Sequence, residues 1–369
     1  MKIALYIVSV VSVVMCVAPL AWGQTPAAEP AQAAPAMTLE TPPPEMVNKI
    51  GLNYRMGLNI TVDFKKLGGL ALSDPGPVAG SAVNRNYDDG YNRVDSTGNN
   101  HGGFIGTWYW GYQSSSSAPG NDTLVLQSYR TLPNATSNNR QDDPQHGFEI
   151  TYSRELYRAK NWRAGLEAAL GYTRLSIGDS QTLKNTTYRT NDAFALNGVV
   201  PPPGGYAGTT NGPGLVISSM PSGRAVTALV RTATITGSRD LDADVFTLRL
   251  GPYAEVPLYK KLSLIFSGGL TLAVGRTDFS FREDVEISDP AYGVNLVSQH
   301  RTGSGSQTDF LVGGYVGGSL AYALTKQLSL VVGGQFQAAG QAVNTEKSKQ
   351  AILDLGKSVI VSIGATFSF

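Results

Sequence analysis

Residues 50–64 read IGLNYRMGLNITVDF, and apolar and polar side chains alternate strictly along this stretch. The even positions from Ile50 to Phe64 are apolar, whereas the odd positions from Gly51 to Asp63 are small, polar or charged. A period of two is typical of a β-strand, because successive side chains leave the backbone on opposite faces. At roughly 3.3 Å per residue the stretch is about 50 Å long, enough to cross a membrane at a tilt of about 45°. We therefore predict a spanning strand whose even face contacts lipid and whose odd face lines an interior.

The same alternation recurs along the chain and predicts ten strands. They cover residues 50–64, 103–112, 123–130, 148–156, 162–175, 246–256, 262–274, 310–322, 328–336 and 358–369. Short connections alternate with long ones, as in spanning barrels with short periplasmic turns and long outer loops. An open sheet edge in lipid would leave backbone N–H and C=O groups unpaired, so the sheet must close. The predicted fold is an all-β, closed antiparallel transmembrane β-barrel.

Two alternatives for the strand count stay open at this point. The barrel has eight strands if residues 103–130 form a loop. Twelve remain possible as well, and residues 224–237 (RAVTALVRTATITG) would then add a hairpin extension above the membrane.

The N-terminal part of the chain predicts export. Residues 1–23 combine Lys2, an apolar run and small residues at Ala21 and Gly23, which is typical of a cleaved signal peptide. The only cysteine, Cys16, lies in this segment, so we expect no disulfide in the mature protein. Residues 24–48 are rich in Pro and Ala and predict a disordered periplasmic linker. The barrel is then expected over 49–369.

Charged residues at inward positions predict a polar lumen. The expected lumen-lining charges are Arg55, Asp63, Glu149, Glu155, Arg163, Glu167, Arg249 and Glu255. Buried charges need partners, and a narrow barrel is filled by its own side chains. We therefore expect Glu–Arg pairs that plug the lumen, with a narrow, porin-like solute channel as the alternative.

Aromatic residues gather near the short connections and at the C-terminus. The predicted interfacial girdle consists of Trp110, Tyr157, Trp162, Tyr259 and Tyr322. The chain ends with Phe367 and Phe369. In its alternating strands and aromatic last strand the chain resembles the bacterial outer-membrane β-barrel families, among them the small OmpA-type barrels. The resemblance implies that the barrel-assembly machinery reads Phe367 and Phe369 as an assembly signal, and that the protein resides in the outer membrane.

The remaining residues give little sign of catalysis. His101, His146 and His300 fall in or beside predicted outer loops, near Asp142, Asp143 and Ser298. These residues make a rim-located hydrolase a third possible function, but they form no recognisable motif, so we expect no enzyme. Scattered histidines without cysteine predict no metal site, and we expect no cofactor.

The expected partners follow from charge and loop composition. A net charge of +1 gives no reason to expect nucleic acid. Residues 73–100 and 197–214 are rich in Asn and Gly and form candidate loops for an extracellular ligand. We expect outer-membrane lipid around the barrel and a structural or surface-interaction role, with the oligomeric state left open.

Overall fold

The computed structural model describes residues 47–77, 83–94, 107–113, 122–208, 215–289, 294–296 and 299–369. The predicted signal peptide and nearly all of the predicted linker lie outside these ranges. Within them, no helix is long and apolar enough to cross a membrane. The regular elements of the described chain are β-strands.

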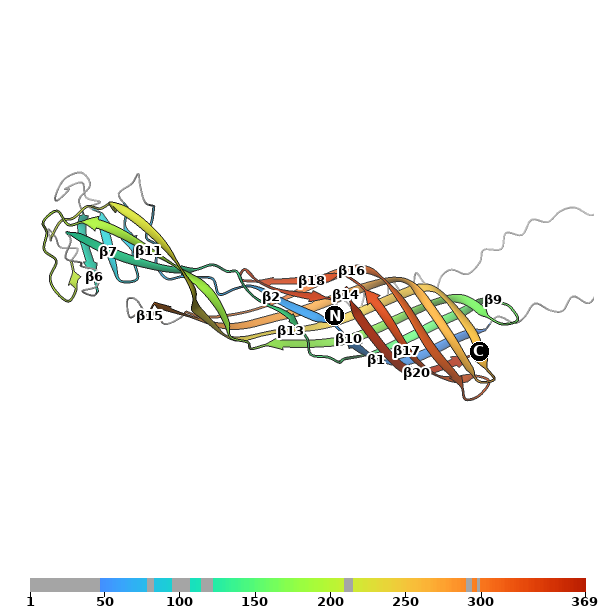
Figure 1. Cartoon of the computed structure of the whole chain (residues 1–369). Helices are drawn as coiled ribbons and strands as arrows, with labels where there is room; N and C mark the ends of the chain where they lie inside the picture. The colour runs from blue at the N-terminus through green and yellow to red at the C-terminus, as the bar shows by residue number, and fades with distance from the viewer. Residues whose placement is uncertain are drawn as a thin grey trace, which may run out of the picture. The chain divides into compact units, whose positions relative to one another are not determined.

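Eight of these strands close a ring in which every neighbouring pair is antiparallel (Figure 1). The ring strands are β1 (Asn48–Leu58), β9 (Gln145–Arg158), β10 (Arg163–Asp179), β13 (Gly223–Tyr259), β14 (Leu262–Asp289), β16 (His300–Ala323), β17 (Leu328–Ala338) and β20 (Ser358–Ser368). They pair in the order β1-β9-β10-β13-β14-β16-β17-β20, and β20 returns to β1. The described residues therefore form an eight-stranded closed barrel.

The ring differs from the preferred count of ten strands. The predicted strands over 103–112 and 123–130 correspond to β6 (Thr107–Tyr112) and β7 (Thr123–Thr131). β6 pairs with β5 (Gly90–Val94) and β12 (Tyr206–Ala207), and β7 pairs with β11 (Leu183–Ala195) and β3 (Leu70–Ala71). Neither strand pairs with its neighbours in the predicted order, so both lie outside the ring.

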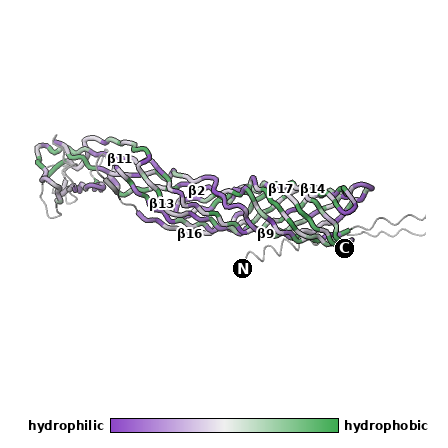
Figure 2. Tube along the Cα trace, turned by 60° about the horizontal axis from the view of Figure 1, so that its bottom comes forward, coloured by the Kyte–Doolittle hydropathy of each residue, from purple (hydrophilic) through white to green (hydrophobic). Residues whose placement is uncertain are grey.

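One part of the barrel has an apolar outer face and a polar interior, and we call it the membrane belt. In β1, Leu52 is 62% exposed, whereas Arg55 on the opposite face is 3% exposed. In β13 the outward-facing apolar positions, which are half-buried or exposed, run from Phe246 to Val256. This distance is about 33 Å along the strand and roughly 23 Å along the barrel axis at a 45° tilt, close to the height of a lipid-facing band of about 25 Å. Hydrophobic and hydrophilic residues alternate along these strands (Figure 2).

β10, β13, β14 and β16 continue past the membrane belt, and there the two faces exchange character. In β13, Leu241, Ala243 and Val245 are buried, while Asp240 and Asp242 lie on the outer face. β14 does the same, because Phe279 and Phe281 point inward beyond Val274. A strand with apolar residues inside and charges outside is a strand in water. We call this part the outer tier.

A second sheet covers the interior of the outer tier. It has the order β18 (Gln341–Glu346), β19 (Lys349–Asp354), β2 (Thr61–Leu67) and β8 (Ala135–Arg140). Phe64 of β2 stacks on Phe279 of β14, with ring centroids 5.9 Å apart. These residues belong to one apolar cluster, which also includes Ile60, Val62, Leu67, Leu175, Ile177, Ile235, Leu241, Val245, Phe281, Val285, Ile287, Leu311 and Leu353. We call this cluster the outer core.

The stretch 50–64 is therefore two strands and not one, which corrects the sequence interpretation. β1 ends at Leu58, and Asn59 adopts a φ of 58°. Asn tolerates this left-handed conformation better than most residues. The backbone turn exchanges the two faces, so Ile60, Val62 and Phe64 point into the outer core and do not contact lipid.

The long connections also differ from the predicted outer loops. Residues 178–243 contain β11 and the first half of β13, and residues 339–356 contain β18 and β19. β4 (Arg85–Asn86), β5, β6, β12, β7 and β11 surround a second apolar cluster. We call these strands the head, and its cluster consists of Tyr87, Trp110, Tyr112, Leu124, Leu126, Phe194, Leu196 and Ile217. β15 (Val294–Leu296) pairs with the end of β14.

Candidate functional site

Three buried charges form an ion-pair layer across the interior of the membrane belt. Glu149 of β9 binds Arg249 of β13 through two hydrogen bonds, of 2.7 and 3.0 Å. Arg55 of β1 lies 2.9 Å from the same carboxylate. Arg249 is also 3.6 Å from Glu167 and lies over the Tyr315 ring, 4.5 Å from its centroid. The layer therefore joins strands from both sides of the barrel.

The sequence makes room for this layer with a glycine. A Cβ atom on Gly171 would lie 2.5 Å from Nη1 of Arg55 and 2.6 Å from Oγ1 of Thr247. Any larger residue at this position would displace the guanidinium that pairs with Glu149. Arg55, Glu149 and Arg249 are each at most 4% exposed. Charges buried this deeply are stable only when paired, so the layer is a single interdependent unit.

A second group of ion pairs lies nearer the short turns. Glu255 of β13 accepts from Lys49 at 2.5 Å and from Arg163 at 2.7 Å. Glu155 pairs with Arg158 at 2.5 Å. Two cations thus share one carboxylate in this group, as two share Glu149 in the ion-pair layer.

The structure brings together seven of the eight predicted lumen charges. Arg55, Glu149, Glu155, Arg163, Glu167, Arg249 and Glu255 all take part in these ion pairs. The placement of Asp63 is wrong, since it lies on β2, contacts Lys65 at 3.4 Å and accepts from the Asn139 amide. The turn at Asn59 is the reason, because it reverses the face on which odd positions lie.

The prediction missed Lys49 and Tyr253, which also face the interior. Both occupy odd positions in strands whose odd face points inward, so the parity that identified Arg55 and Glu255 was sufficient to find them. Tyr253 is 4% exposed, and its hydroxyl has no hydrogen-bond partner among the described residues.

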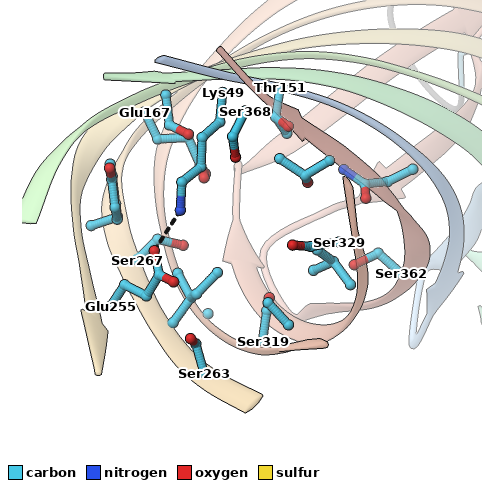
Figure 3. A pocket seen from close by; sticks show the side chains of 18 of the residues that line it. Lys49, Thr151, Glu167, Glu255, Ser263, Ser267, Ser319, Ser329, Ser362 and Ser368 are labelled. Carbon is cyan, nitrogen blue, oxygen red and sulfur yellow. Dashed lines mark hydrogen bonds and ion pairs between the residues drawn. The ribbon is translucent and has the colours of Figure 1, made fainter. Parts of the chain in front are cut away.

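Below the ion-pair layer lies a cavity of about 260 Å³, which we call the chamber (Figure 3). Arg55, Glu149 and Arg249 line its inner end. Lys261 and Lys326, in the short turns after β13 and β16, line its other end. Serine hydroxyls cover the wall formed by β14, β16, β17 and β20, namely those of Ser263, Ser267, Ser319, Ser329, Ser362 and Ser368.

The aromatic residues of the membrane belt lie in two rows. At the short-turn end, Tyr157, Trp162, Tyr259 and Tyr322 are each at least 44% exposed. Phe367 and Phe369 are exposed at the same end and stack at 6.4 Å. The prediction that Trp110 belongs to the interfacial girdle is wrong, because Trp110 is fully buried in the head cluster. It packs on Tyr206 at 4.8 Å, so its apolar surface is covered by protein.

A second aromatic row, which the sequence analysis missed, lies where the membrane belt meets the outer tier. Strand register aligns Tyr54, Phe148, Tyr172 and Phe246 on four adjacent strands. Phe246 is then opposite Val274, and Val274 is opposite Phe310. Aromatic girdles flank the apolar band of spanning barrels at both interfaces. The two rows therefore mark both edges of the membrane belt.

The histidines form no enclosed site among the described residues. His300 contacts Asp284 at 2.8 Å, with both side chains exposed, and His146 contacts the Tyr54 hydroxyl at 2.6 Å. His101 and Ser298 lie outside the described residues. No group of three or more potential metal ligands occurs in the described ranges.

The head contains a buried polar network. Asp192 of β11 accepts two hydrogen bonds of 2.6 Å from Arg224 and one of 2.5 Å from the Tyr87 hydroxyl. Burial, together with the hydrogen bond to Asp192, raises the pKa of Tyr87 above its ordinary value. Tyr87 therefore stays protonated, and the network holds β11 and β13 together beneath the head cluster.

The solved structures to which the chain is similar include bacterial outer-membrane proteins. The attachment invasion locus protein Ail of Yersinia pestis, solved with the heparin analogue sucrose octasulfate, has 11% identity and a TM-score of 0.27, covering 88% of this chain and 99% of its own. The outer membrane protease OmpT from Escherichia coli has 11% identity and a TM-score of 0.30, covering 90% and 99%.

No family model and no curated protein matches the chain. Membership of the small OmpA-type barrels therefore stays a prediction. TM-scores this low carry no functional argument. The assignment as a transmembrane β-barrel rests on the closed ring of strands and on the apolar outer face of the membrane belt.

Proposed function

We propose that the protein is an outer-membrane anchor that does not conduct solutes and that presents its head for contact with extracellular macromolecules. The observation that carries this proposal is the order of layers along the interior. The chamber ends at the Arg55–Glu149–Arg249 layer, and the outer core follows directly beyond it.

The outer core supports closure more strongly than the ion-pair layer does. Charged side chains can exchange partners and admit water, as in narrow gated pores. Val245, Phe279 and Leu311 instead pack in an apolar cluster and are each at most 9% exposed. Protein interiors pack with few voids larger than a water molecule. A solute that passed the ion-pair layer would then have to enter this cluster, which argues against the porin-like alternative.

The head supports the surface-interaction part of the proposal. It is connected through β11 and β13 to strands of the outer tier, so it belongs to the same side of the membrane belt. The segments predicted as candidate loops for an extracellular ligand, 73–100 and 197–214, contain β4, β5 and β12 of the head in their described parts. Parts of a barrel that are dispensable for spanning a membrane are the parts free to contact partners.

Export, outer-membrane location and assembly belong to the same proposal. The signal peptide over 1–23 would direct the chain out of the cytoplasm. Phe367 and Phe369 end the last ring strand with exposed aromatic rings, which fits the assembly signal implied by the resemblance. Removal of both rings should leave full-length protein outside the outer-membrane fraction.

Planar-bilayer recordings test the closed interior. Purified full-length chain should add no discrete conductance steps, and Phe279→Ala should add none as long as the barrel stays folded. Steps in the unaltered chain that change when Arg249 is replaced would contradict the proposal and support a narrow channel.

Cell-surface display tests the role of the head. Bacteria that carry the chain should gain binding to at least one immobilised extracellular matrix protein or glycan, compared with the same strain without it. Trp110→Ala should reduce that binding, because it removes the largest side chain of the head cluster. Tyr259→Ala, at the short-turn end, is the matched control and should leave binding unchanged. Equal binding by the strain without the chain would refute the role.

A further inference from the structure

The chamber has two chemically different walls. β14, β16, β17 and β20 contribute small hydroxyl side chains, among them Ser267, Ser319 and Ser362 (Figure 3). The opposite wall carries the charged residues, which come from β1, β9, β10 and β13 and lie among uncharged polar side chains such as Asn53 and Thr151. Spanning barrels of eight strands usually fill their interior with side chains. Here the serine wall leaves the space open along half of the barrel.

The lining of the chamber carries an excess of positive charge. Six cationic side chains line it, and three carboxylates do, which leaves a formal charge of +3. The cations are Lys49, Arg55, Arg163, Arg249, Lys261 and Lys326, and the carboxylates are Glu149, Glu167 and Glu255. Each of Glu149 and Glu255 is shared by two cations. The excess therefore reaches from the inner end to the turns.

The two lysines at the mouth contribute most directly to this excess. Neither Lys261 nor Lys326 has an ion-pair partner among the described residues, and both line the end where the chamber meets the short turns. The Lys261 ammonium lies 6.0 Å from the centroid of the outward-facing Tyr322 ring, and Lys261 also lines the chamber, so it stands at the rim of the mouth. A charged group in the mouth would meet two ammonium groups that no protein carboxylate neutralises.

A buried polar group without a partner also lies in the chamber wall. Tyr253 and Glu255 lie two residues apart on the inward face of β13. The Tyr253 hydroxyl is buried and makes no hydrogen bond to another described residue. Buried hydroxyls almost always have a partner. A polar molecule bound in the chamber would supply this partner.

The size of the chamber limits what this molecule can be. A volume of about 260 Å³ lies just below the range of roughly 300–1,000 Å³ for small-molecule sites. The chamber is closed at its inner end, so its occupant enters and leaves by the mouth. These conditions suit a molecule the size of a single sugar ring.

We propose that the chamber is a binding site for a small anionic solute that carries several hydroxyl groups, of the sugar-acid class. The anionic group lies between Lys261 and Lys326 at the mouth. The hydroxyl groups of the solute exchange hydrogen bonds with Ser267, Ser319 and Ser362. The mouth of this site opens on the side of the membrane belt opposite the head, and the site is independent of any contact that the head makes.

Calorimetric titration of the purified full-length chain in detergent micelles tests the proposal, with glucuronate as the probe. Glucose has the hydroxyl groups without the charge, and acetate has the charge without the hydroxyl groups. We expect glucuronate to bind about tenfold more tightly than either. Equal affinity for glucose would overturn the role of the lysines, and equal affinity for acetate would overturn the role of the serines.

Matched variants locate the site. Lys261→Ala combined with Lys326→Ala should weaken glucuronate binding by about fivefold or more, whereas Lys260→Ala, next in the chain but not in the lining, should not. Ser319→Phe should abolish binding by filling the chamber, and Ser304→Phe, on the exposed outer part of the same strand, should not. Absence of binding by the unaltered chain, or unchanged binding in the chamber variants, would overturn the proposal.

Discussion

Glu149→Gln isolates the ion-pair layer, because it removes one charge and almost no volume. Glu149 is the shared partner of Arg55 and Arg249, at 2.9 and 2.7 Å. In the variant both guanidinium groups stay buried, at 3% and 4% exposure, without that carboxylate. Removal of one partner from a buried ion pair costs about 3–5 kcal/mol.

The loss of the Glu149 charge should leave Arg55 with weaker partners than Arg249. Arg249 keeps Glu167 at 3.6 Å and the face of Tyr315. Arg55 keeps only weak hydrogen bonds of 3.5 Å to Thr247 and Gln337. Arg249→Met should therefore lower the free energy of unfolding by about 1.5–3 kcal/mol, which is less than Glu149→Gln. The reason is that Arg55 still pairs with Glu149 after this change.

Equilibrium unfolding in detergent by guanidinium measures both values, with the fraction of folded barrel read from gel mobility without boiling. Arg276→Gln is the matched control. It breaks the Arg276–Asp278 pair, whose side chains are 52% and 47% exposed, and exposed pairs contribute at most about 1 kcal/mol. The reasoning fails if Glu149→Gln unfolds at the same denaturant concentration as this control, or if Arg249→Met is the more destabilising of the two.

Three further predictions address the other parts of the fold. Phe279→Ala should destabilise the outer tier by about 3–5 kcal/mol, because Phe279 is fully buried against Phe64; an unchanged proteolysis rate of β2 in native-state digestion would contradict this. Burial raises the pKa of Asp179, but hydrogen bonds from Ser137, the Gln181 amide and Arg239 outweigh it and lower the pKa. The ionised Asp179 carboxylate therefore stabilises the fold at pH values above its unfolded pKa of about 3.9. That stability is lost as pH falls through the folded pKa, and Asp179→Asn should flatten this acid-side loss in pH-dependent unfolding. The predicted mature chain has no cysteine, so a lipid-embedded thiol reagent should label Leu52→Cys, which is 62% exposed, and spare Ile60→Cys, which is 3% exposed; strong labelling of Ile60→Cys would restore the single long strand.

The sequence pattern was most informative within the membrane belt. There one face must be apolar because lipid surrounds it, so alternation in FTLRLGPYAEV (246–256) and its counterparts identified the spanning strands and the inward positions of Arg249 and Glu255. The same rule was not extended to residues 238–245, SRDLDADV, because the predicted strand began only at residue 246. The three aspartates of this stretch alternate with Leu241, Ala243 and Val245 of the outer core, so its apolar face points inward and its charged face outward.

Two other features of the fold cannot be predicted from composition or alternation. A left-handed φ at Asn59 depends on tertiary contacts, since its amide donates to Asp143 and its side chain to the Lys357 carbonyl. Trp110 occurs in TWYWGY (107–112), and this run suits a lipid interface and an apolar protein cluster equally well. Only the pairing of β6 with β5 and β12 decides between them.

The passage of β13 and β14 from the membrane belt into the outer tier restricts how the length of this chain can vary during evolution. A single residue inserted beside Val245 would shift one half of the hairpin by one position relative to the other. Every side chain of the shifted half would then point to the opposite face of the sheet, so apolar residues would face water and charged residues would face lipid or the outer core. At Asn59 and Gly340, where positive φ angles already separate the two halves, an added residue could be absorbed by the bend. Homologous chains should therefore keep a constant number of residues through this hairpin and accumulate insertions at those two bends.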